Sequence, residues 1–430
     1  MKPYSEMTRE ELHYEKEKCE SEFEAMKAMN LSLDMSRGKP CKEQLDLSNP
    51  MMDVLYSNCD LVDEVGVDCR NYGVFGGIHE AKRLMGEMSE VSPDSMLIFG
   101  NSSLNIMFDT ISRSVTHGIC GNKPWCKYDE PVKFLCPVPG YDRHFRITEY
   151  FGIEMINVPM TENGPDMDIV ESYVNNDPLV KGIWCVPKYS NPQGYTYSEE
   201  TVSRFAKLSP AADDFRIYWD NAYSIHHLYD EPENQDYLPE ILEECKKAGH
   251  PDMVFKFIST SKVSFPGSGI AAVATSKKNL ADISRYCRVQ TIGHDKLNQL
   301  RHVRFFKDIN GMQEHMKKHA AILRPKFEAV LEILNDELGG LGIAEWTNPK
   351  GGYFVSFQGM KGTAQAVVAK AEEAGVKMTN AGATFPYGVD PDDSNIRIAP
   401  SYPSLEELRT AMHIFTLSVK LVSLYKLLSH

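Results

Sequence analysis

The sequence lacks the short patterns that mark common metal and disulfide proteins. Its ten cysteines are scattered without a Cys-x-x-Cys pair, which argues against a zinc site and a disulfide framework. The thirteen histidines include no His-Glu-x-x-His spacing, and the pair His226-His227 has no third ligand nearby in the sequence, so a structural role is favoured over metal binding. Unpaired thiols of this kind are typical of a reducing cytoplasm.

Long apolar runs and excess positive charge are also missing. No stretch is expected to span a bilayer, and the first residues lack the apolar segment of a signal peptide. The formal net charge is −14, whereas binding to nucleic acids or to anionic membranes requires a basic surface. We therefore expect neither nucleic acid nor membrane as a partner, and a cytoplasmic location.

What is present indicates a large α/β protein. A chain of 430 residues is too long for one small core, so two domains are expected. From Met96 onward, apolar strand-like runs alternate with helical stretches, which argues for a mostly parallel sheet covered by helices. The expected strands are 96–99, 132–136, 153–158, 180–186, 215–219, 253–258 and 269–275.

The helical pattern is clearest at the two ends of the chain. Residues 8–30 form an amphipathic pattern, and residues 295–336 form a long helical run that Gly311 and Pro325 are expected to interrupt. Residues 351–357 are predicted to form a strand, and Ser404 begins a capping box before the last helix. We expect a large domain at 60–300, and a smaller one that combines 1–59 with 301–430.

Lys262 is the centre of the predicted site. It lies in Ser259-Thr260-Ser261-Lys262, directly after the apolar run 253–258 and before the turn Pro266-Gly267. Open α/β sheets bind ligands at the carboxyl ends of their strands, and a lysine buried there can form a Schiff base. Taken alone, the same pattern also fits a surface lysine at the end of a strand.

Five other stretches supply groups that suit a phosphorylated aromatic cofactor. Ser102 and Ser103 lie where a strand leads into a helix, and free N–H groups at such a position favour a phosphate. Tyr141 follows the strand 132–136 and can lie on a flat heterocycle. For each of these stretches alone, an ordinary helix cap or a tyrosine packed in a turn is an equally good interpretation.

The remaining stretches carry an amide, a carboxylate and a guanidinium. Asn191 offers an amide donor, and Asp220 ends the strand 215–219, where a carboxylate can keep a pyridine nitrogen protonated. Tyr223 follows three residues later. Arg397 projects from the face of a strand opposite to its apolar neighbours, and its fork matches a carboxylate. A turn, a loop carboxylate and an edge-strand charge are the alternatives.

The order of these residues resembles one family closely. Asn191-Pro192, Asp220-x-x-Tyr223, Ser259-x-Ser-Lys262 and Arg397 are similar to the motifs of fold type I pyridoxal phosphate (PLP)-dependent aminotransferases. The stretches Ser-Arg-Gly38-Lys-Pro, Tyr72-Gly-x-x-Gly-Gly, Gly-Asn-Ser102-Ser103-Leu and Ser-Thr-Ser-Lys262 resemble a bacterial aspartate aminotransferase subgroup that is often catalogued beside aminotransferase-like regulators. The resemblance covers nearly the whole chain. It implies a mostly parallel seven-stranded sheet in a large domain and a smaller α+β domain.

The resemblance also implies roles. Lys262 would be the Schiff-base lysine and proton shuttle, Asp220 the partner of the pyridine nitrogen, and Asn191 and Tyr223 the contacts of the 3-oxygen. Tyr141 would stack on the ring. The implied phosphate ligands are Ser102, Ser103, Ser259 and, from the neighbouring subunit of a homodimer, Tyr72. Arg397, with the backbone of Gly38, would bind the α-carboxylate of an amino-acid or 2-oxo-acid substrate.

Two points leave the expected function open. Most relatives carry an arginine in Pro-Gly-x-Arg as a phosphate ligand, whereas this chain has Pro266-Gly267-Ser268-Gly269. A dicarboxylate substrate needs a second cation, for which Arg37, Lys39 and Lys350 are candidates. We expect transamination between aspartate and 2-oxoglutarate. The alternatives are another PLP reaction on aromatic or other amino acids and, less favoured, a PLP-binding regulatory module.

Overall fold

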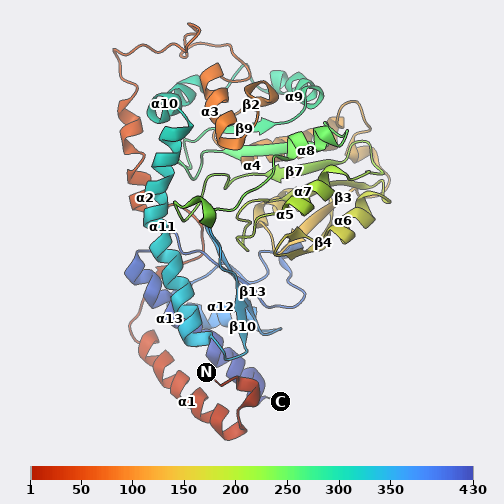
Figure 1. The fold of residues 1–430 in the computed structure, drawn as a ribbon. Helices are drawn as coiled ribbons and strands as arrows, with labels where there is room; N and C mark the ends of the chain where they lie inside the picture. The colour runs from red at the N-terminus through yellow and green to blue at the C-terminus, as the bar shows by residue number, and fades with distance from the viewer. Residues whose placement is uncertain (1, 430) are drawn as a thin grey trace.

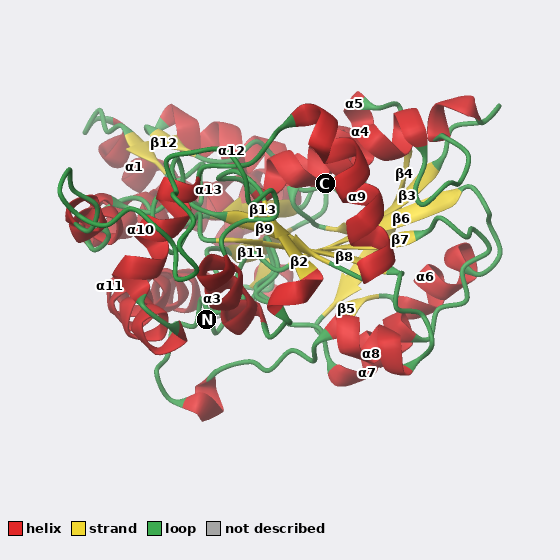
Figure 2. Ribbon diagram, turned by 90° about the horizontal axis from the view of Figure 1, so that it is seen from above, coloured by secondary structure: helices red, strands yellow, loops and turns green. Residues whose placement is uncertain are grey.

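The main sheet of the computed structural model, which describes residues 2–429, has eight strands and helices on both faces (Figures 1 and 2). In spatial order they are β2 (Met96–Ile98), β9 (Ala271–Ala274), β8 (Val254–Ser259), β7 (Arg216–Asp220), β6 (Val180–Cys185), β3 (Lys133–Val138), β4 (Glu154–Thr161) and β5 (Gly164–Pro165). The pairs along β8–β7–β6–β3–β4 are parallel, and the other pairs are antiparallel. The mostly parallel α/β fold is confirmed.

The expected count of seven strands is too low by one. The eighth strand, β5, consists of two residues that fold back on the end of β4. Gly164 makes this return possible because its φ of +122° is one that side-chain-bearing residues rarely adopt. A two-residue strand carries no periodic pattern, so no signal in the sequence indicated it.

Helices cover each face of the sheet with a separate apolar core. On one face lie α4 (Ser103–His117), α5 (Asp142–Tyr150) and α9 (Lys277–Gln290), packed on Phe134, Tyr218 and Phe257. On the other lie α6 (Met167–Val174), α7 (Glu199–Ala206) and α8 (Ile241–Lys247). The side chains of a strand alternate between the two faces, so neighbouring residues of β7 belong to different cores.

A second sheet lies at the other end of the molecule. It is antiparallel, in the order β10 (Ala344–Trp346), β11 (Val355–Gly359), β13 (Asn395–Ile398). The helices α12 (Ala364–Glu373) and α13 (Leu405–Leu428) belong to this part, and α1 (Arg9–Lys27) lies along α13 (Figure 1). Strand β1 (Leu33–Asp34) pairs with β12 (Val376–Lys377). The N-terminal segment thus contacts the C-terminal part, while the domain boundaries stay a prediction.

The long helical run after residue 295 is divided elsewhere than expected. Helix α10 (Lys296–Phe306) ends before Lys307, and α11 (Ile309–Leu338) begins after Asp308, whose carboxylate accepts the N–H of Gly311 at 2.9 Å. Gly311 is therefore in the first turn of α11, and Pro325 lies inside it without ending it. The neighbouring side chains Leu323 and Phe327 are buried, and this packing holds the helix despite the lost N–H.

The remaining two α-helices of the described chain come early, and one strand begins later than predicted. The helices α2 (Lys42–Asp46) and α3 (His79–Ser89) precede the main sheet. Strand β11 begins only at Val355, and the preceding Gly352 has a φ of +79°, which an extended strand does not adopt. Both glycines before it lie against Tyr189, where a Cβ at Gly351 would meet the ring and one at Gly352 the Cβ and carbonyl oxygen. The capping box at Ser404 is confirmed at the start of α13.

The apolar composition of helix α13 contradicts the expectation that no stretch is long and apolar enough to cross a membrane. By length and composition it is apolar enough to do so, with a mean hydropathy of 1.3 over its best window. However, 67% of that window is buried within the protein. The helix packs against α1, α11 and α12, which accounts for its apolar composition as a core helix.

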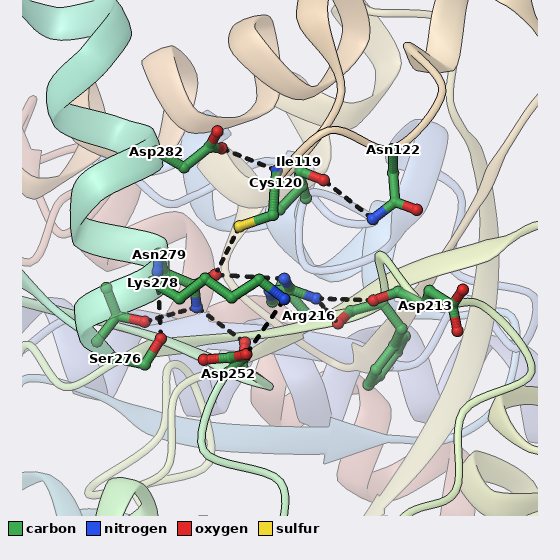
Figure 3. A network of polar contacts seen from close by, with 12 residues as sticks. Ile119, Cys120, Asn122, Asp213, Arg216, Asp252, Ser276, Lys278, Asn279 and Asp282 are labelled. Carbon is green, nitrogen blue, oxygen red and sulfur yellow. Dashed lines mark hydrogen bonds and ion pairs between the residues drawn. The ribbon is translucent and has the colours of Figure 1, made fainter.

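A polar network lies at the end of the main sheet where β7 begins, opposite to the carboxyl ends of β7 and β8 (Figure 3). At the start of β7, Arg216 donates to the side chain of Asn279 at 3.2 Å and to the carbonyl of Phe215 at 2.8 Å. The N–H of Cys120 donates to Asp282 at 2.9 Å. These contacts join α9 to β7 and to the loop after α4, and so fix the strands whose far ends carry the candidate site.

Candidate active site

The predicted site residues converge at the carboxyl ends of the parallel strands. Asp220 is the last residue of β7 and pairs in register with Phe257 of the neighbouring strand β8. Lys262 follows three residues after β8 ends. Its Nζ is 4.8 Å from the centre of the Tyr223 ring and 5.6 Å from that of Tyr353. The lysine is half-buried, with two aromatic faces beside its amine.

Asp220 is held by a histidine that the motifs did not indicate. His144 Nε2 lies 3.0 Å from Asp220 Oδ2, and both side chains are buried. An ionised carboxylate only accepts hydrogen bonds, so the histidine is the donor. The imidazole also stacks on Trp184, with ring centroids 4.5 Å apart and planes 12° apart. The other oxygen, Asp220 Oδ1, is buried without a hydrogen-bond partner in the described chain.

Two of the three predicted tyrosines, Tyr141 and Tyr223, lie close to the lysine. Tyr223 is 3% exposed, and its burial, followed by the charge of Asp220, raises the pKa of its hydroxyl far above the usual value. Burial also raises the pKa of Tyr141 to about 12, an effect that the nearby Lys262 reduces. Both phenols are therefore neutral donors at physiological pH. The Tyr141 ring meets His144 edge-on, at 4.9 Å between centroids.

Arg397 lies at the centre of a second group of contacts. Its Nη1 donates to Asp142 Oδ1 at 3.0 Å and to Asn191 Oδ1 at 3.3 Å, and its Nη2 lies 3.4 Å from Thr379 Oγ1. The guanidinium carbon is 4.8 Å above the centre of the Phe354 ring. In the part of the chain that the structure describes, the buried Nε has no partner. The structure therefore brings together two of the predicted site residues, Arg397 and Asn191.

Gly38 approaches the same group closely. A Cβ atom at this position would lie only 2.2 Å from the Phe354 ring, so only glycine fits without displacing that ring. The hydroxyl of Thr379 donates to the carbonyl of Ser36 at 2.7 Å, which holds the preceding residues of the loop beside Arg397. Gly38 and Arg397 both contact the Phe354 ring, so the backbone of Gly38 lies near the arginine.

The hydroxyl groups predicted to hold a phosphate lie together at the start of α4. Ser102 is the N-cap residue of α4, yet its side chain makes no capping hydrogen bond, and Ser103 is the first helical residue. Ser259 Oγ donates to Ser261 Oγ at 3.2 Å, and Ser261 Oγ donates to the carbonyl of Asn101 at 3.3 Å. The end of β8 and the start of α4 thus form one polar corner. Tyr72, 80% exposed, stays outside the buried cluster.

Arg301 reaches the loop where the expected arginine is missing. Its Nη2 donates to Ser268 Oγ at 2.5 Å, and its buried Nε has no partner among residues 2–429. On the same helix, Asn298 donates to the carbonyl of Gly269 at 2.8 Å. Arg301 follows Ser268 by 33 residues in the sequence, so no local motif could have linked the two side chains. For His144 the sequence did carry a signal. It follows Tyr141, the N-cap residue of α5, by three residues, and residues three apart along a helix face the same side.

Comparisons with known proteins agree with this geometry. The family model described as aspartate amino-transferase matches residues 7–430. An aspartate aminotransferase of Corynebacterium glutamicum is 45% identical over 400 residues, which cover 92% of this chain and 90% of that protein.

Solved structures show the same architecture. An aspartate transaminase of Corynebacterium glutamicum superposes with a TM-score of 0.94 at 43% identity, covering 97% of each chain. The α-aminoadipate aminotransferase LysN of Thermus thermophilus, complexed with N-(5'-phosphopyridoxyl)-L-leucine, has a TM-score of 0.72 at 21% identity, covering 92% of this chain and 93% of its own. The second match supports the fold alone. The chain belongs to the aspartate aminotransferase family, and the resemblance inferred from its motifs is confirmed.

Proposed function

We propose that this aminotransferase moves the amino group of L-aspartate to 2-oxoglutarate with PLP as its cofactor. The observation that carries the proposal is the buried Oδ1 of Asp220, which has no partner among residues 2–429, at the strand end next to Lys262. A buried carboxylate oxygen without a partner is costly, and a protonated ring nitrogen would satisfy it. The identity to an aspartate aminotransferase over most of the chain supports the substrate.

The residues present fit this cofactor. Lys262 would hold it through its amine, Asp220 would face its ring nitrogen, and Tyr223 and Asn191 would contact its 3-oxygen. The ring would lie against Tyr141. Ser102, Ser103 and Ser259 would bind its phosphate, next to the N-terminus of α4. When bound, PLP draws electrons from the substrate carbon that carries the amino group.

Lys262 is proposed to move the proton at that carbon. An amine acts as a base through its free electron pair, and the two aromatic rings beside this one, those of Tyr223 and Tyr353, belong to neutral phenols that carry no negative charge to hold the amine protonated. His226 has an unpartnered, buried ring, and burial, followed by the charge of Lys262, lowers its pKa well below the usual value. The imidazole of His226 therefore stays neutral at physiological pH.

Arg397 is proposed to bind the α-carboxylate of the substrate. Its Nη1 already pairs with the carboxylate of the partly exposed Asp142, which supports the proposal, and a substrate carboxylate would replace that contact. Asn191, which accepts from the same guanidinium, orients it. The backbone of Gly38, which packs against the same Phe354 ring as Arg397, would lie beside the bound carboxylate. The substrate is thereby oriented with its reacting carbon toward Lys262.

Arg37 is our candidate for the distal carboxylate. Of the three candidate cations, Lys39 lies 3.7 Å above the ring of Tyr402, and Lys350 is 3.7 Å from Asp236. Arg37 is exposed and belongs to the loop that Thr379 ties beside Arg397. Replacing it with glutamine should raise the KM for aspartate more than that for alanine, because only aspartate carries the second carboxylate.

Arg301 is proposed to supply the cation that the motif lacks. Relatives with Pro-Gly-x-Arg have an arginine where this chain has Gly269. Arg301 approaches the same turn from α10, and its guanidinium is anchored by Ser268. Guanidinium groups suit phosphate because they donate two parallel hydrogen bonds.

A homodimer is proposed to complete the site. Exposed apolar side chains occur in two stretches that lie next to each other, since the Lys296 ammonium donates to the carbonyl of Gly73 at 3.2 Å. They are Met52, Tyr56, Val65 and Tyr72 in the first stretch and Val289 and Ile292 in the second. Such a surface is typical of an interface, and through it Tyr72 would reach the phosphate of the partner's cofactor. Size-exclusion chromatography tests the dimer.

The cytoplasm is the compartment we propose, as expected from the sequence. All ten cysteines are unpaired in the structure, and seven of them are buried: Cys19, Cys41, Cys69, Cys136, Cys185, Cys245 and Cys287. Reduced thiols in this number suit a reducing environment. Fractionation of the producing cells would test this location.

The decisive test is the half-reaction with single amino acids. Stopped-flow absorbance should show conversion of the bound pyridoxal form to the pyridoxamine form with aspartate, and Lys262→Ala should abolish both the lysine-bound cofactor band and turnover. The exposed Lys277→Ala is the matched control. Product analysis with tyrosine and cysteine conjugates separates the aromatic and lyase alternatives. A fully active Lys262→Ala would refute the proposal.

A further inference from the structure

A second polar cavity lies on the other face of the main sheet. It has a volume of about 330 Å³, is open to solvent on one side, and is lined by the end of α3, the turn after β7, residues 232–240 and the start of α11. Asp220 and Asn221 follow each other at the end of β7, so their side chains point to opposite faces. Asp220 faces the candidate active site, whereas Asn221 lines this cavity.

Two lysines line the cavity on this face. Lys256 on β8 is paired in register with Trp219, and it donates to the carbonyl of Ser89 at 2.7 Å and to Glu240 at 2.9 Å. Lys188 donates to the carbonyl of Ser224 at 3.0 Å. An ammonium group carries three protons, so these contacts leave two unused on Lys188 and one on Lys256.

Two further polar groups are unsatisfied in the same place. Asn221 is 6% exposed, and its Oδ1 is buried without a partner in the described part of the chain, as is Ser224 Oγ. Both residues line the cavity. Buried polar atoms normally have partners, and each one left without a partner costs about 1–3 kcal/mol. The cavity therefore offers unused donors and an unused acceptor.

The charge of the lining excludes a simple anion as the best ligand. Against Lys188 and Lys256 stand four carboxylates, those of Glu87, Glu90, Asp236 and Glu240. Glu240 is already paired with Lys256, so Lys188 makes no direct ion pair among the described residues while three carboxylates, those of Glu87, Glu90 and Asp236, remain on the rim. A ligand that carries both a carboxylate and an ammonium group matches this arrangement.

We propose that this cavity is a second binding site for a free α-amino acid. The carboxylate of the ligand accepts from Lys188 and from the hydroxyl of Ser224. The ammonium group donates to Asn221 Oδ1 and faces the carboxylates of the rim. Asn221 adjoins Asp220 in the chain, and Ser224 adjoins Tyr223. A ligand in this cavity therefore contacts the turn that positions these two residues of the proposed active site.

Calorimetry on borohydride-reduced holoenzyme tests this site. Reduction makes the bond between Lys262 and the cofactor permanent, so an added amino acid cannot react in the active site. Glycine and L-alanine should bind about tenfold more tightly than acetate or methylammonium, since each of these probes lacks one of the two charge-assisted contacts. Lys188→Met and Ser224→Ala should weaken glycine binding, the first by about tenfold.

Matched variants distinguish binding in this cavity from binding elsewhere on the protein. The exposed Lys277→Met should bind glycine as the unmodified chain does, and Ser224→Ala provides a second variant if Lys188→Met fails to fold. Acetate binding as tightly as glycine, or an unchanged affinity in both cavity variants, would contradict the proposal. Absence of binding by fully reduced enzyme would overturn this site alone, because complete reduction itself reports that the proposed lysine–cofactor bond exists.

Discussion

His144 donates a hydrogen bond from Nε2 to Asp220 Oδ2 at 3.0 Å, while the other oxygen of Asp220 is buried without a partner in the described residues. The histidine is itself fixed between Trp184 and Tyr141. A carboxylate held on one side only can receive a second donor on the other. This asymmetry defines where the ring nitrogen of a cofactor would lie.

Removing the donor of His144 should slow catalysis without unfolding the site. We expect His144→Phe to lower kcat by about tenfold or more, because a hydrogen bond to a charged group contributes about 1.5–3 kcal/mol. Phenylalanine keeps the stacking on Trp184. His144→Gln, which retains a donor, should recover part of the rate. The absorbance of the bound cofactor as a function of pH should shift in the phenylalanine variant and less in the glutamine one, which a purely structural role would not produce.

Arg397→Lys should impair substrate binding. Lysine keeps the charge but loses the two-point contact with a carboxylate, so kcat/KM for aspartate should fall by about 100-fold, a loss of about 3 kcal/mol. Steady-state kinetics measures it. The control is Arg409→Lys, a half-exposed arginine paired with Glu332, which should leave the kinetics unchanged. Equal kinetics in the Arg397 variant and the control would contradict the proposed carboxylate site.

Arg301→Gln should weaken cofactor binding. The proposed phosphate contact predicts a dissociation constant for PLP about tenfold higher or more, measured by titrating the cofactor-free protein and following absorbance. The control Arg304→Gln lies one turn further along α10, where its guanidinium contacts Cys59. The phosphorus NMR signal of bound PLP should also shift only in the Arg301 variant. An unchanged affinity would leave phosphate binding to the hydroxyls and the helix N-terminus.

Stability should fall as the pH drops through the range of His302. Burial lowers the pKa of this histidine to about 4 from 6.5, so the folded chain binds fewer protons than the unfolded chain between these values. Stability is therefore lost as the pH decreases from about 6.5 to about 4. Between pH 7 and pH 5, urea unfolding should show a loss about 2 kcal/mol larger in the unmodified chain than in His302→Gln. Parallel pH profiles for the two would refute the shift.

Asp214 lies outside the candidate active site, and Asp214→Asn should lower the free energy of unfolding. Asp214 is buried, and it accepts from Lys181 at 2.7 Å and from the Trp125 indole at 2.8 Å. Removing one charge of a buried pair leaves the other uncompensated, which costs about 3–5 kcal/mol. Denaturant unfolding measures it. Asp177→Asn, in a more exposed pair with Lys133, should cost less than about 1 kcal/mol.

The sequence predicted much of the site because strand ends can be located from local patterns. The runs that became β7 and β8 are apolar, and parallel strands bring their carboxyl ends to one edge, so Asp220 and Lys262 had to lie close together. The hydrogen bond from Arg397 to Asn191 was not predicted, because it joins segments 206 residues apart. Pro325 misled the helix prediction, because the packing of Leu323 and Phe327 outweighs the loss of one backbone hydrogen bond.

By itself, the sequence determined the alternation of strands and helices and the order of the motifs, and it indicated Lys262 as the candidate lysine, since each of these depends on neighbours within a few residues. Only the tertiary structure decided that His144 supports Asp220, that Arg301 approaches the turn lacking an arginine, and that two lysines share a cavity behind the site. Those relationships join side chains from segments far apart in the chain. Their distances are set by how the helices pack on the sheet, which local patterns do not encode.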